Sequence, residues 1–341
     1  MTKDQIVIVT RMDDTHADDV IGRLGEMGYE PIRLNTDDIP ANVTMTMSLG
    51  SDPGSAELGG TIEILTNGRV VAFDQVRSVW WRRPGPLGLP DDLSEQEREF
   101  AGEEIDHALR GLWASLECYW ISHPENIRRA GWRAEQLRRA GRFGFDVPRT
   151  LITTDPEQVR RLHRELGGQV VFKVMSDPFL GAPKMVEKYP DQPPPEPRLA
   201  YTTLITDSEL AMLDAVSSVP CMFQEYIPKR VELRVTVIGD EVFAAEIHSQ
   251  EREDTRVDWH GSMEVPYHKA DLPTELSERC LAFVHSYGLN FSAMDLILTP
   301  DDRYVFVENN PNGQFGFVEQ LVPELEMTTA LADCLIRAGN S

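Results

Sequence analysis

The sequence predicts a mixed α/β (α+β) protein of three segments, roughly residues 1–120, 121–222 and 223–341. Three observations support this prediction. The chain opens with an apolar strand, an amphipathic helix and a second strand, an order typical of an open parallel sheet. Further along, short strand patterns alternate with helical patterns. With 341 residues the chain is long enough for two or three domains and a sizeable core.

The charge and hydrophobicity of the sequence limit the classes of molecule that the protein is expected to bind. The formal net charge is −23, and binding to long nucleic acid needs a basic surface, so we expect no nucleic acid partner. A small anion stays compatible, because local Lys, Arg and bound metal ions can override the overall field. The sequence holds no apolar run of the roughly 18 residues that a membrane span needs. The start, MTKDQIVIVT, is too short and too acidic for a signal peptide, which predicts a cytoplasmic protein.

The four cysteines are widely separated and form no metal-binding spacing, which favours buried free thiols. They are Cys118, Cys221, Cys280 and Cys334.

The first segment is expected to combine a parallel sheet with a small meander. Strands are predicted at residues 6–10 and in YEPIRLN, with a helix at 17–27 between them. Three short alternating stretches, VTMTMSL, GTIEIL and RVVAF, follow with turn signals and predict the meander. The strand SVWW then runs into Arg82-Arg83-Pro84, and residues 91–120 are charged and helical.

The second segment is expected to begin with one helix over residues 124–144. A strand then leads to a helix for which Thr153 or Thr154 and Asp155 supply capping oxygens, with Pro156 in its first turn. The strand QVVFKVM carries one lysine, and residues 176–200 are Pro-rich and expected to be mobile. The strand AYTTLIT and a helix over 207–218 complete the segment.

The third segment is dominated by strands. CMFQEYI, VELRVTVIG and EVFAAEIHS are predicted as three successive strands, and TELSERCLAFVHSYGL as a helix. NFSAMDLILTP and RYVFVEN are predicted to form a β-hairpin, and the last helix to span residues 326–338.

Three polar side chains at the end of this hairpin predict a metal site. Asp295 lies in one strand, Glu308 in the next, and Asn310 on the same side two residues later. Two carboxylates and an amide oxygen suit Mg²⁺, which completes its octahedron with phosphates and water. A polar strand end that hydrogen-bonds its own turn remains an alternative.

Three further features suggest a nucleotide. Lys173 interrupts an apolar strand, where its charge needs an anion such as a phosphate or an internal Asp or Glu. The linker 225–227 offers backbone groups for an adenine edge. On the following strand, Glu232 and Arg234 share one face, placed for ribose hydroxyls and a phosphate. An ordinary cross-strand Glu–Arg pattern remains the alternative.

The order of these elements resembles the ATP-grasp superfamily. VRSVWWRRP, VPRTLITTDPE, AYTTLIT, QEYIPKRVELRVTVIGDEVFAAEIHSQ and VENNPNGQFG together resemble the ATP-grasp ribosomal peptide maturases of the MvdD and microviridin-ligase kind, also called graspetide synthetases. The resemblance runs from Ile6 to the last helix. It implies a pre-ATP-grasp domain at 1–120, a central ATP-grasp subdomain at 121–222 and a C-terminal subdomain at 223–341.

The resemblance also implies roles for these residues with ATP and Mg²⁺ as cofactors. Lys173 would hold the α- and β-phosphates, and Arg133 stands where the family usually has a second lysine. Arg234 would stabilise the transferred phosphoryl group. Glu225, Tyr226 and Ile227 would frame the adenine, Glu232 the ribose, and Asp295, Glu308 and Asn310 the Mg²⁺.

The implied reaction is peptide macrocyclisation. A side-chain carboxylate of a ribosomal precursor peptide takes the γ-phosphoryl group of ATP. A Ser or Thr hydroxyl or a Lys amine then attacks the acyl phosphate, giving an ω-ester or ω-amide ring with release of ADP and phosphate. The family also implies a homodimer. Two alternatives stay open: a ligase that adds an amino acid to a peptide, as RimK-like and glutathione-synthetase-like enzymes do, and a non-catalytic peptide-binding protein.

Peptide contacts are predicted on three surfaces. Arg82 and Arg83 are candidates for substrate carboxylates, or for ion pairs with the acidic helix at 91–106. The helix at 207–218 is a candidate leader dock, or a solvated face. The segment EIHSQEREDTRVDWHG is a candidate flap, or a plain exposed hairpin; the family often has Arg where this chain has His260. The side chains concerned on the last two surfaces are Glu209, Asp214, Arg252, Arg256, Asp258 and Trp259.

Overall fold

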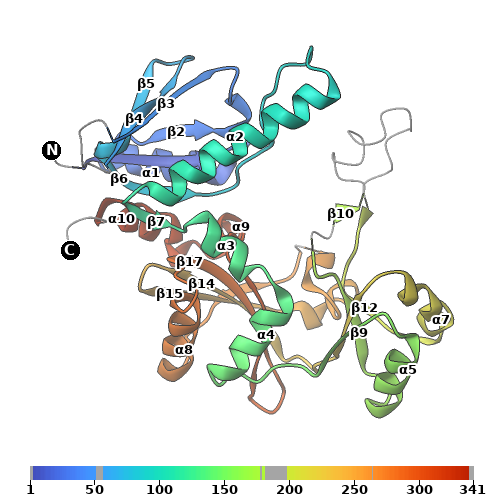
Figure 1. The fold of residues 1–341 in the computed structure, drawn as a ribbon. Helices are drawn as coiled ribbons and strands as arrows, with labels where there is room; N and C mark the ends of the chain where they lie inside the picture. The colour runs from blue at the N-terminus through green and yellow to red at the C-terminus, as the bar shows by residue number, and fades with distance from the viewer. Residues whose placement is uncertain (1–2, 51–56, 177–178, 181–197, 263, 338–341) are drawn as a thin grey trace.

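The computed structural model describes residues 3–50, 57–176, 179–180, 198–262 and 264–337 (Figure 1). Its N-terminal sheet is parallel and confirms the predicted opening. The strand order is β2-β1-β6-β7, with α1 (Thr15–Glu26) connecting β1 to β2. The strands are β1 (Gln5–Thr10), β2 (Ile32–Asn35), β6 (Val76–Trp81) and β7 (Tyr119–Ile121).

Strand β7 is a correction to the predicted helix over 91–120. Helix α2 (Glu95–Ser115) starts at a capping box formed by Ser94 and Glu97, and it ends before β7. The aromatic and β-branched residues of β7, Tyr-Trp-Ile, suit a buried strand beside β6.

The meander is confirmed as an antiparallel sheet in the order β3-β4-β5. Its strands are β3 (Val43–Leu49), β4 (Leu58–Ile64) and β5 (Arg69–Ala72), with short 3-10 turns η1 (Thr36–Asp38) and η2 (Phe73–Gln75) flanking them.

The predicted helix over 124–144 is two helices, α3 (Pro124–Ala130) and α4 (Arg133–Arg142). Gly131 ends α3, its N–H bonding to the carbonyl of Arg128, and α4 starts two residues later. The break makes Arg133 the first residue of α4. Ala130 and Ala140 are buried in the core of the C-terminal sheet, so both helices pack on that sheet despite their place in the second segment.

A small antiparallel sheet forms a separate lobe in Figure 1, in the order β12-β9-β13-β8. Its strands are β8 (Thr150–Thr153), β9 (Val170–Lys173), β12 (Thr203–Leu204) and β13 (Cys221–Glu225). Helix α5 (Pro156–Glu165) covers it, and its N-cap is Asp155, one of the predicted capping residues. The predicted helix over 207–218 is a short α7 (Asp207–Ala211), capped by Thr206, followed by a 3-10 helix η3 (Leu213–Ser218).

The predicted mobility of residues 176–200 falls largely outside the described residues. Within that segment β10 (Phe179–Leu180) pairs with β11 (Arg198–Leu199).

The largest sheet is antiparallel, in the order β16-β15-β14-β17-β18. It confirms the three predicted strands of the third segment and the hairpin of β17 with β18. The strands are β14 (Val231–Ile238), β15 (Glu241–Ile247), β16 (Tyr267–Lys269), β17 (Phe291–Leu298) and β18 (Tyr304–Asn310). One face packs on α4 and α8 (Thr274–His285). The other packs on α9 (Gly316–Leu321), η7 (Pro323–Leu325) and α10 (Met327–Arg337), which join it to α1 and the N-terminal sheet.

The segment between β15 and β16, predicted as a flap or an exposed hairpin, instead forms three 3-10 turns. They are η4 (Ser249–Glu251), η5 (Glu253–Thr255) and η6 (Trp259–Gly261). The hydroxyl of Thr255 donates to the carbonyl of Ser249 and closes the first loop. At Gly261 a Cβ atom would lie 2.3 Å from the carbonyl oxygen of Asp254, so glycine is required there. The segment is folded against the body of the protein, because Trp259 is buried on Phe317.

Two strands cross the predicted segment boundaries, β7 at 120/121 and β13 at 222/223. We therefore propose boundaries after Ile121 and after Glu225. In the described part of the chain no helix is both long enough and apolar enough to span a bilayer.

His16 links α1 to the loop before α9 and predicts a pH dependence of stability. Its Nδ1 accepts from the N–H of Gly316 at 3.3 Å, and its ring lies 5.2 Å from Phe315. Burial, and secondly the charge of Arg82, lower its pKa from 6.5 to about 4. Below pH 6.5 the unfolded chain binds a proton that the folded chain does not, so the stability falls from pH 6.5 towards pH 4.

We expect His16→Gln to flatten this part of the profile. The free energy of unfolding, measured by urea titration between pH 7 and pH 4, checks it. Parallel profiles for the wild type and the variant would contradict the buried, neutral state of His16.

Candidate functional site

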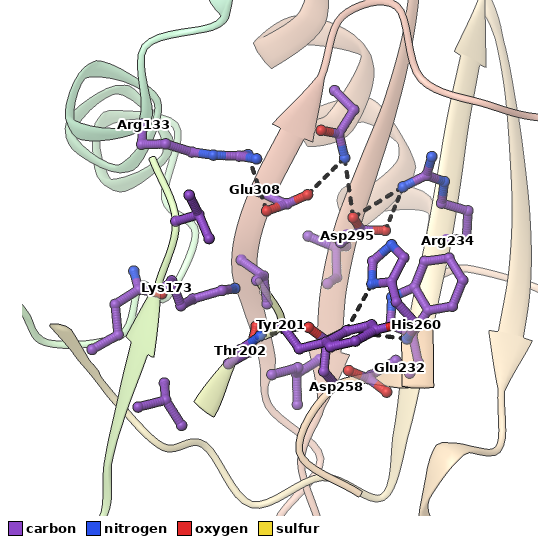
Figure 2. A pocket seen from close by; sticks show the side chains of 18 of the residues that line it. Arg133, Lys173, Tyr201, Thr202, Glu232, Arg234, Asp258, His260, Asp295 and Glu308 are labelled. Carbon is purple, nitrogen blue, oxygen red and sulfur yellow. Dashed lines mark hydrogen bonds and ion pairs between the residues drawn. The ribbon is translucent and has the colours of Figure 1, made fainter. Parts of the chain in front are cut away.

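A cavity of about 870 Å³ lies between the small sheet and the largest sheet (Figure 2). Strands β9 and β13 supply one wall, and β14, β17 and β18 the other. The 248–262 segment and residues 200–202 close one side. Of the predicted site residues, the cavity is lined by Arg83, Arg133, Lys173, Glu225, Tyr226, Ile227, Glu232, Arg234, Asp258, Trp259, Asp295, Glu308 and Asn310.

The register of β14, β17 and β18 places three charged side chains of the cavity opposite one another. Arg234 on β14 stands opposite Asp295 on β17, which stands opposite Glu308 on β18. A bulge next to Asp295 shifts the register, and Asn310 pairs with Ala293 two positions along. The sequence pattern of alternating side chains thus becomes one row across three neighbouring strands.

Asp295, Glu308 and Asn310 converge on one point. The Nδ2 atom of Asn310 lies 3.1 Å from Oδ2 of Asp295 and 2.8 Å from Oε1 of Glu308. Two carboxylate oxygens from different strands therefore accept hydrogen bonds from the same amide nitrogen. A hard divalent cation could take the place of this N–H group between the two carboxylates, with Asn310 turned to present its Oδ1 as a further ligand. Among the described residues no three His, Cys, Asp or Glu side chains form a metal cluster. A cation held by this pair would therefore need further oxygen ligands, such as phosphate and water.

Glu308 is an anion of the cavity that faces two cations. Its Oε2 lies 3.0 Å from Nη1 of Arg133 at the start of α4. Burial acts to raise the pKa of Glu308, but the charges of Arg133 and Lys173 outweigh it and lower the pKa to about 2. Glu308 is therefore ionised throughout the physiological range.

Asp295 differs from Glu308 in the direction of its pKa shift and in its cationic partner, which is Arg234. Burial raises its pKa, and the Arg234 guanidinium opposes that rise. Arg234 donates to both oxygens of Asp295, at 2.8 and 2.9 Å, and to the carbonyl of Gln314 at 3.0 Å. At Gly313, beside this arginine, a Cβ atom would lie 2.7 Å from the Cβ of Ala293, so glycine lets the loop approach the strands.

Lys173 faces this row from the small sheet at the end of β9 (Figure 2). Burial lowers its pKa, and the negative charge of Glu308 opposes that effect. An additional anion in the cavity would therefore favour the charged form of Lys173.

The linker at 225–227 lines the cavity, but two of its three amide groups are already used. The N–H of Glu225 donates to the carbonyl of Arg149, and that of Tyr226 to the carbonyl of Gln169. This corrects the expectation of a free linker backbone. Within the described residues, the N–H of Ile227 has no recorded partner and remains available to a ligand.

Lys229 is a cavity residue that the sequence reasoning missed. Its Nζ binds Oε1 of Glu232 at 2.7 Å and the carbonyl of Val257 at 2.8 Å. It therefore fixes Glu232 and ties the 248–262 segment to β14. The signal was present in the sequence as a lysine three residues before Glu232. The second oxygen of Glu232 is buried and has no hydrogen-bond partner among the described residues.

His260 is a second residue that was not assigned. Its ring lines the cavity, stacks on Trp259 with centroids 3.7 Å apart, and bonds through Nδ1 to Oδ1 of Asp258 at 2.7 Å. The signal was its position directly after Asp258-Trp259.

Arg82 is not a substrate contact, which corrects the prediction. Its side chain is fully buried, and Nη1 donates to the carbonyls of Asn312 at 2.9 Å and Gly313 at 3.1 Å. It acts on the loop after β18 from behind the cavity wall. Arg83 lines the cavity itself.

The remaining candidates for peptide contact lie outside the residues that line the cavity. Glu209 forms the capping box of α7, and Asp214 pairs with Arg160 at 2.8 Å. Arg252 pairs with Asp254 and Glu264. Arg256 contributes its carbonyl, which accepts from Tyr226 and Gln250. A peptide-binding role for any of these side chains stays a prediction.

The comparisons with known proteins agree with this architecture. Residues 5–128 match the model of the MvdD pre-ATP grasp domain. The macrocyclase MdnC of Microcystis aeruginosa MRC, solved with the precursor peptide MdnA, is 30% identical, with a TM-score of 0.83 over 98% of this chain and 100% of that chain. A comparison with curated protein sequences gave no match.

Two further structures are similar over nearly the whole chain. A RiPP-associated ATP-grasp ligase of Chryseobacterium gregarium, solved with ADP and a leader and core peptide, is 26% identical, with a TM-score of 0.85 over 98% of this chain and 96% of that chain. The macrocyclase MdnB of Microcystis aeruginosa MRC is 29% identical, with a TM-score of 0.76 over 97% and 99%. The chain belongs to the ATP-grasp ligases that mature ribosomally made peptides.

Proposed function

We propose that the chain is an ATP-dependent macrocyclase of a ribosomal precursor peptide with a leader and a Thr-, Asp- or Glu-containing core. An Asp or Glu side chain of the peptide takes the γ-phosphoryl group of ATP. A Ser or Thr hydroxyl, giving an ω-ester, or a Lys amine, giving an ω-amide, then attacks the carbonyl carbon. Phosphate leaves, and the products are the ring, ADP and phosphate.

The observation that carries this proposal is the convergence of Asp295 and Glu308 on one atom of Asn310, with cations on either side. These three residues would hold Mg²⁺, which supplies positive charge for phosphoryl transfer when bound. Lys173 and Arg133 both face Glu308 and would bind phosphate oxygens. Arg234 would stabilise the negative charge of the transferred phosphoryl group. Its guanidinium is held beside the proposed metal site by hydrogen bonds to Asp295 and to the carbonyl of Gln314.

The nucleoside end of ATP would lie against the linker. Ile227 offers an amide for the adenine edge, and Glu225 and Tyr226 line the same wall. Glu232 has one buried oxygen without a partner among the described residues, which would accept from a ribose hydroxyl. Two similar structures support the proposal that this chain binds a nucleotide and a peptide. One was solved with ADP and a leader and core peptide, and the other with its precursor peptide. A homodimer and a cytoplasmic location remain predictions.

The macrocyclase and the alternative amino-acid ligase differ in their substrates, because only the ligase needs a free amino acid. The chain, a precursor peptide encoded beside its gene, ATP and Mg²⁺ should release ADP without any free amino acid. ADP release that begins only when a mixture of free amino acids is added would overturn the macrocyclase proposal in favour of the ligase. No ADP release with peptide and amino acids together would point to a non-catalytic binding protein.

A further inference from the structure

Asp258 and His260 form a hydrogen-bonded pair in the wall of the cavity. The binding of ATP and Mg²⁺ proposed above assigns no role to this pair. His260 lines the cavity with Asp295 and Glu308, and Figure 2 shows its ring between the strands and Asp258. The family that the sequence resembles often has an arginine at this position, where this chain has His260.

Hydrogen bonds fix which ring nitrogen carries the proton. Oδ1 of Asp258 accepts from Nδ1 of His260 at 2.7 Å and from its backbone N–H at 3.1 Å, and Oδ2 accepts from the N–H of Thr202 at 2.9 Å. Burial acts to raise the pKa of Asp258, but the hydrogen bonds from His260 and Thr202 outweigh it and hold the pKa well below its usual range. An ionised carboxylate needs a donor, so a neutral His260 keeps its proton on Nδ1 and a lone pair on Nε2.

The ring is also held in place. It stacks on Trp259 at an interplanar angle of 26°, and the buried Trp259 packs in turn on Phe317, with centroids 5.8 Å apart. The His260 side chain remains 49% exposed, and within the described residues Nε2 has no recorded partner. A positioned imidazole with an orienting carboxylate behind it and a free Nε2 in front is the arrangement of a general base.

Charges around the ring favour proton acceptance. Burial acts against the charged ring, but the hydrogen bond and charge of Asp258 outweigh it and raise the pKa of His260. A raised pKa makes the ring a stronger proton acceptor.

We propose that His260 is the proton acceptor for the peptide nucleophile in the ring-closing step, with Asp258 as its orienting partner. The inference rests on the proposed macrocyclase function. The oxygen of a Ser or Thr hydroxyl forms the bond to the acyl carbon while its proton moves to Nε2 of His260. The carbon–oxygen bond to phosphate breaks, phosphate leaves with the electron pair, and the imidazolium returns its proton to solvent.

The test separates phosphorylation from ring closure. The wild type, His260→Gln and His260→Arg are incubated with the precursor peptide, ATP and Mg²⁺, with and without hydroxylamine. Hydroxylamine is a strong nucleophile that needs no base and converts an acyl phosphate into a hydroxamate. ADP, rings and hydroxamate are counted by chromatography and mass spectrometry. His107→Gln, on the exposed face of α2, is the matched control and should behave as the wild type.

For both His260 variants we expect rings per ADP to fall about 100-fold, while ADP and hydroxamate formation with hydroxylamine stays within about threefold of the wild type. Continued ADP and hydroxamate formation shows that the variants are folded and bind both substrates. Wild-type rings per ADP in His260→Gln would overturn the proposal. Recovery of rings in His260→Arg would do so too, because arginine supplies a cation and no base. If the wild type itself makes no rings, the macrocyclase function fails instead.

Discussion

Glu308→Gln should abolish ADP formation, with a loss of roughly 1,000-fold or more, because several kcal/mol of metal-assisted charge stabilisation are removed. Glu308 is both a proposed Mg²⁺ ligand and the anion that Arg133 and Lys173 face. The neutral amide can fulfil neither role. Peptide-dependent ADP release at saturating ATP and Mg²⁺ measures the effect, and Glu103→Gln on the exposed face of α2 serves as the control.

The same variant should change the acid branch of the stability profile. Because the pKa of Glu308 is lowered to about 2, its contribution is present above its unfolded pKa of 4.5 and is lost as the pH falls towards 2. Glu308→Gln should therefore lose stability at pH 7 relative to the wild type, and the difference should shrink in acid. Turnover near the wild-type level in Glu308→Gln would show that this carboxylate does not hold the metal.

Arg82→Met should destabilise the fold by about 3–5 kcal/mol, the cost typical of breaking a buried charged contact. Arg82 is fully buried, and Asp14, which is 5% exposed, lies 3.8 Å from its Nε. The methionine leaves the Asp14 carboxylate and the carbonyls of Asn312 and Gly313 without this donor. Urea unfolding measures the loss, with Arg110→Met on the surface of α2 as the matched control.

A second effect of Arg82→Met follows from the loop that it holds. Only Pro311 separates Asn310 from Asn312 and Gly313, so a loosened loop should weaken ATP binding and lower turnover without removing any cavity side chain. Adding Asp14→Asn to Arg82→Met should recover part of the stability, because the unpaired buried charge is then gone. An Arg82→Met protein as stable as the Arg110→Met control would contradict the buried role.

The centre of the site could be predicted from the sequence because it lies on strands. Asp295, Glu308 and Asn310 follow the alternation of a hairpin, and Arg234 follows that of β14, so period-two reasoning places them on one face. Lys173 could be found because a charge inside an apolar strand is conspicuous. The structure brings all five to one cavity.

The errors lie where tertiary contacts override local pattern. The break of α3 from α4 at Gly131 and Trp132 moves Arg133 to a helix start, where its guanidinium meets Glu308. The 248–262 segment belongs to the predicted flap or hairpin but is held in turns by contacts such as Thr255 to Ser249 and by the buried ring of Trp259. The exposed appearance of Arg82 in sequence gave no sign that a loop some 230 residues later covers it.

The most direct test of the central claim is the mass of the precursor peptide after incubation with this chain, ATP and Mg²⁺. We expect a peptide lighter by one water per ring, with one ADP formed for each ring. Hydroxide restores the mass if the rings are esters and leaves it unchanged if they are amides. A peptide of unchanged mass, or one that gains mass only when free amino acids are supplied, would contradict the account.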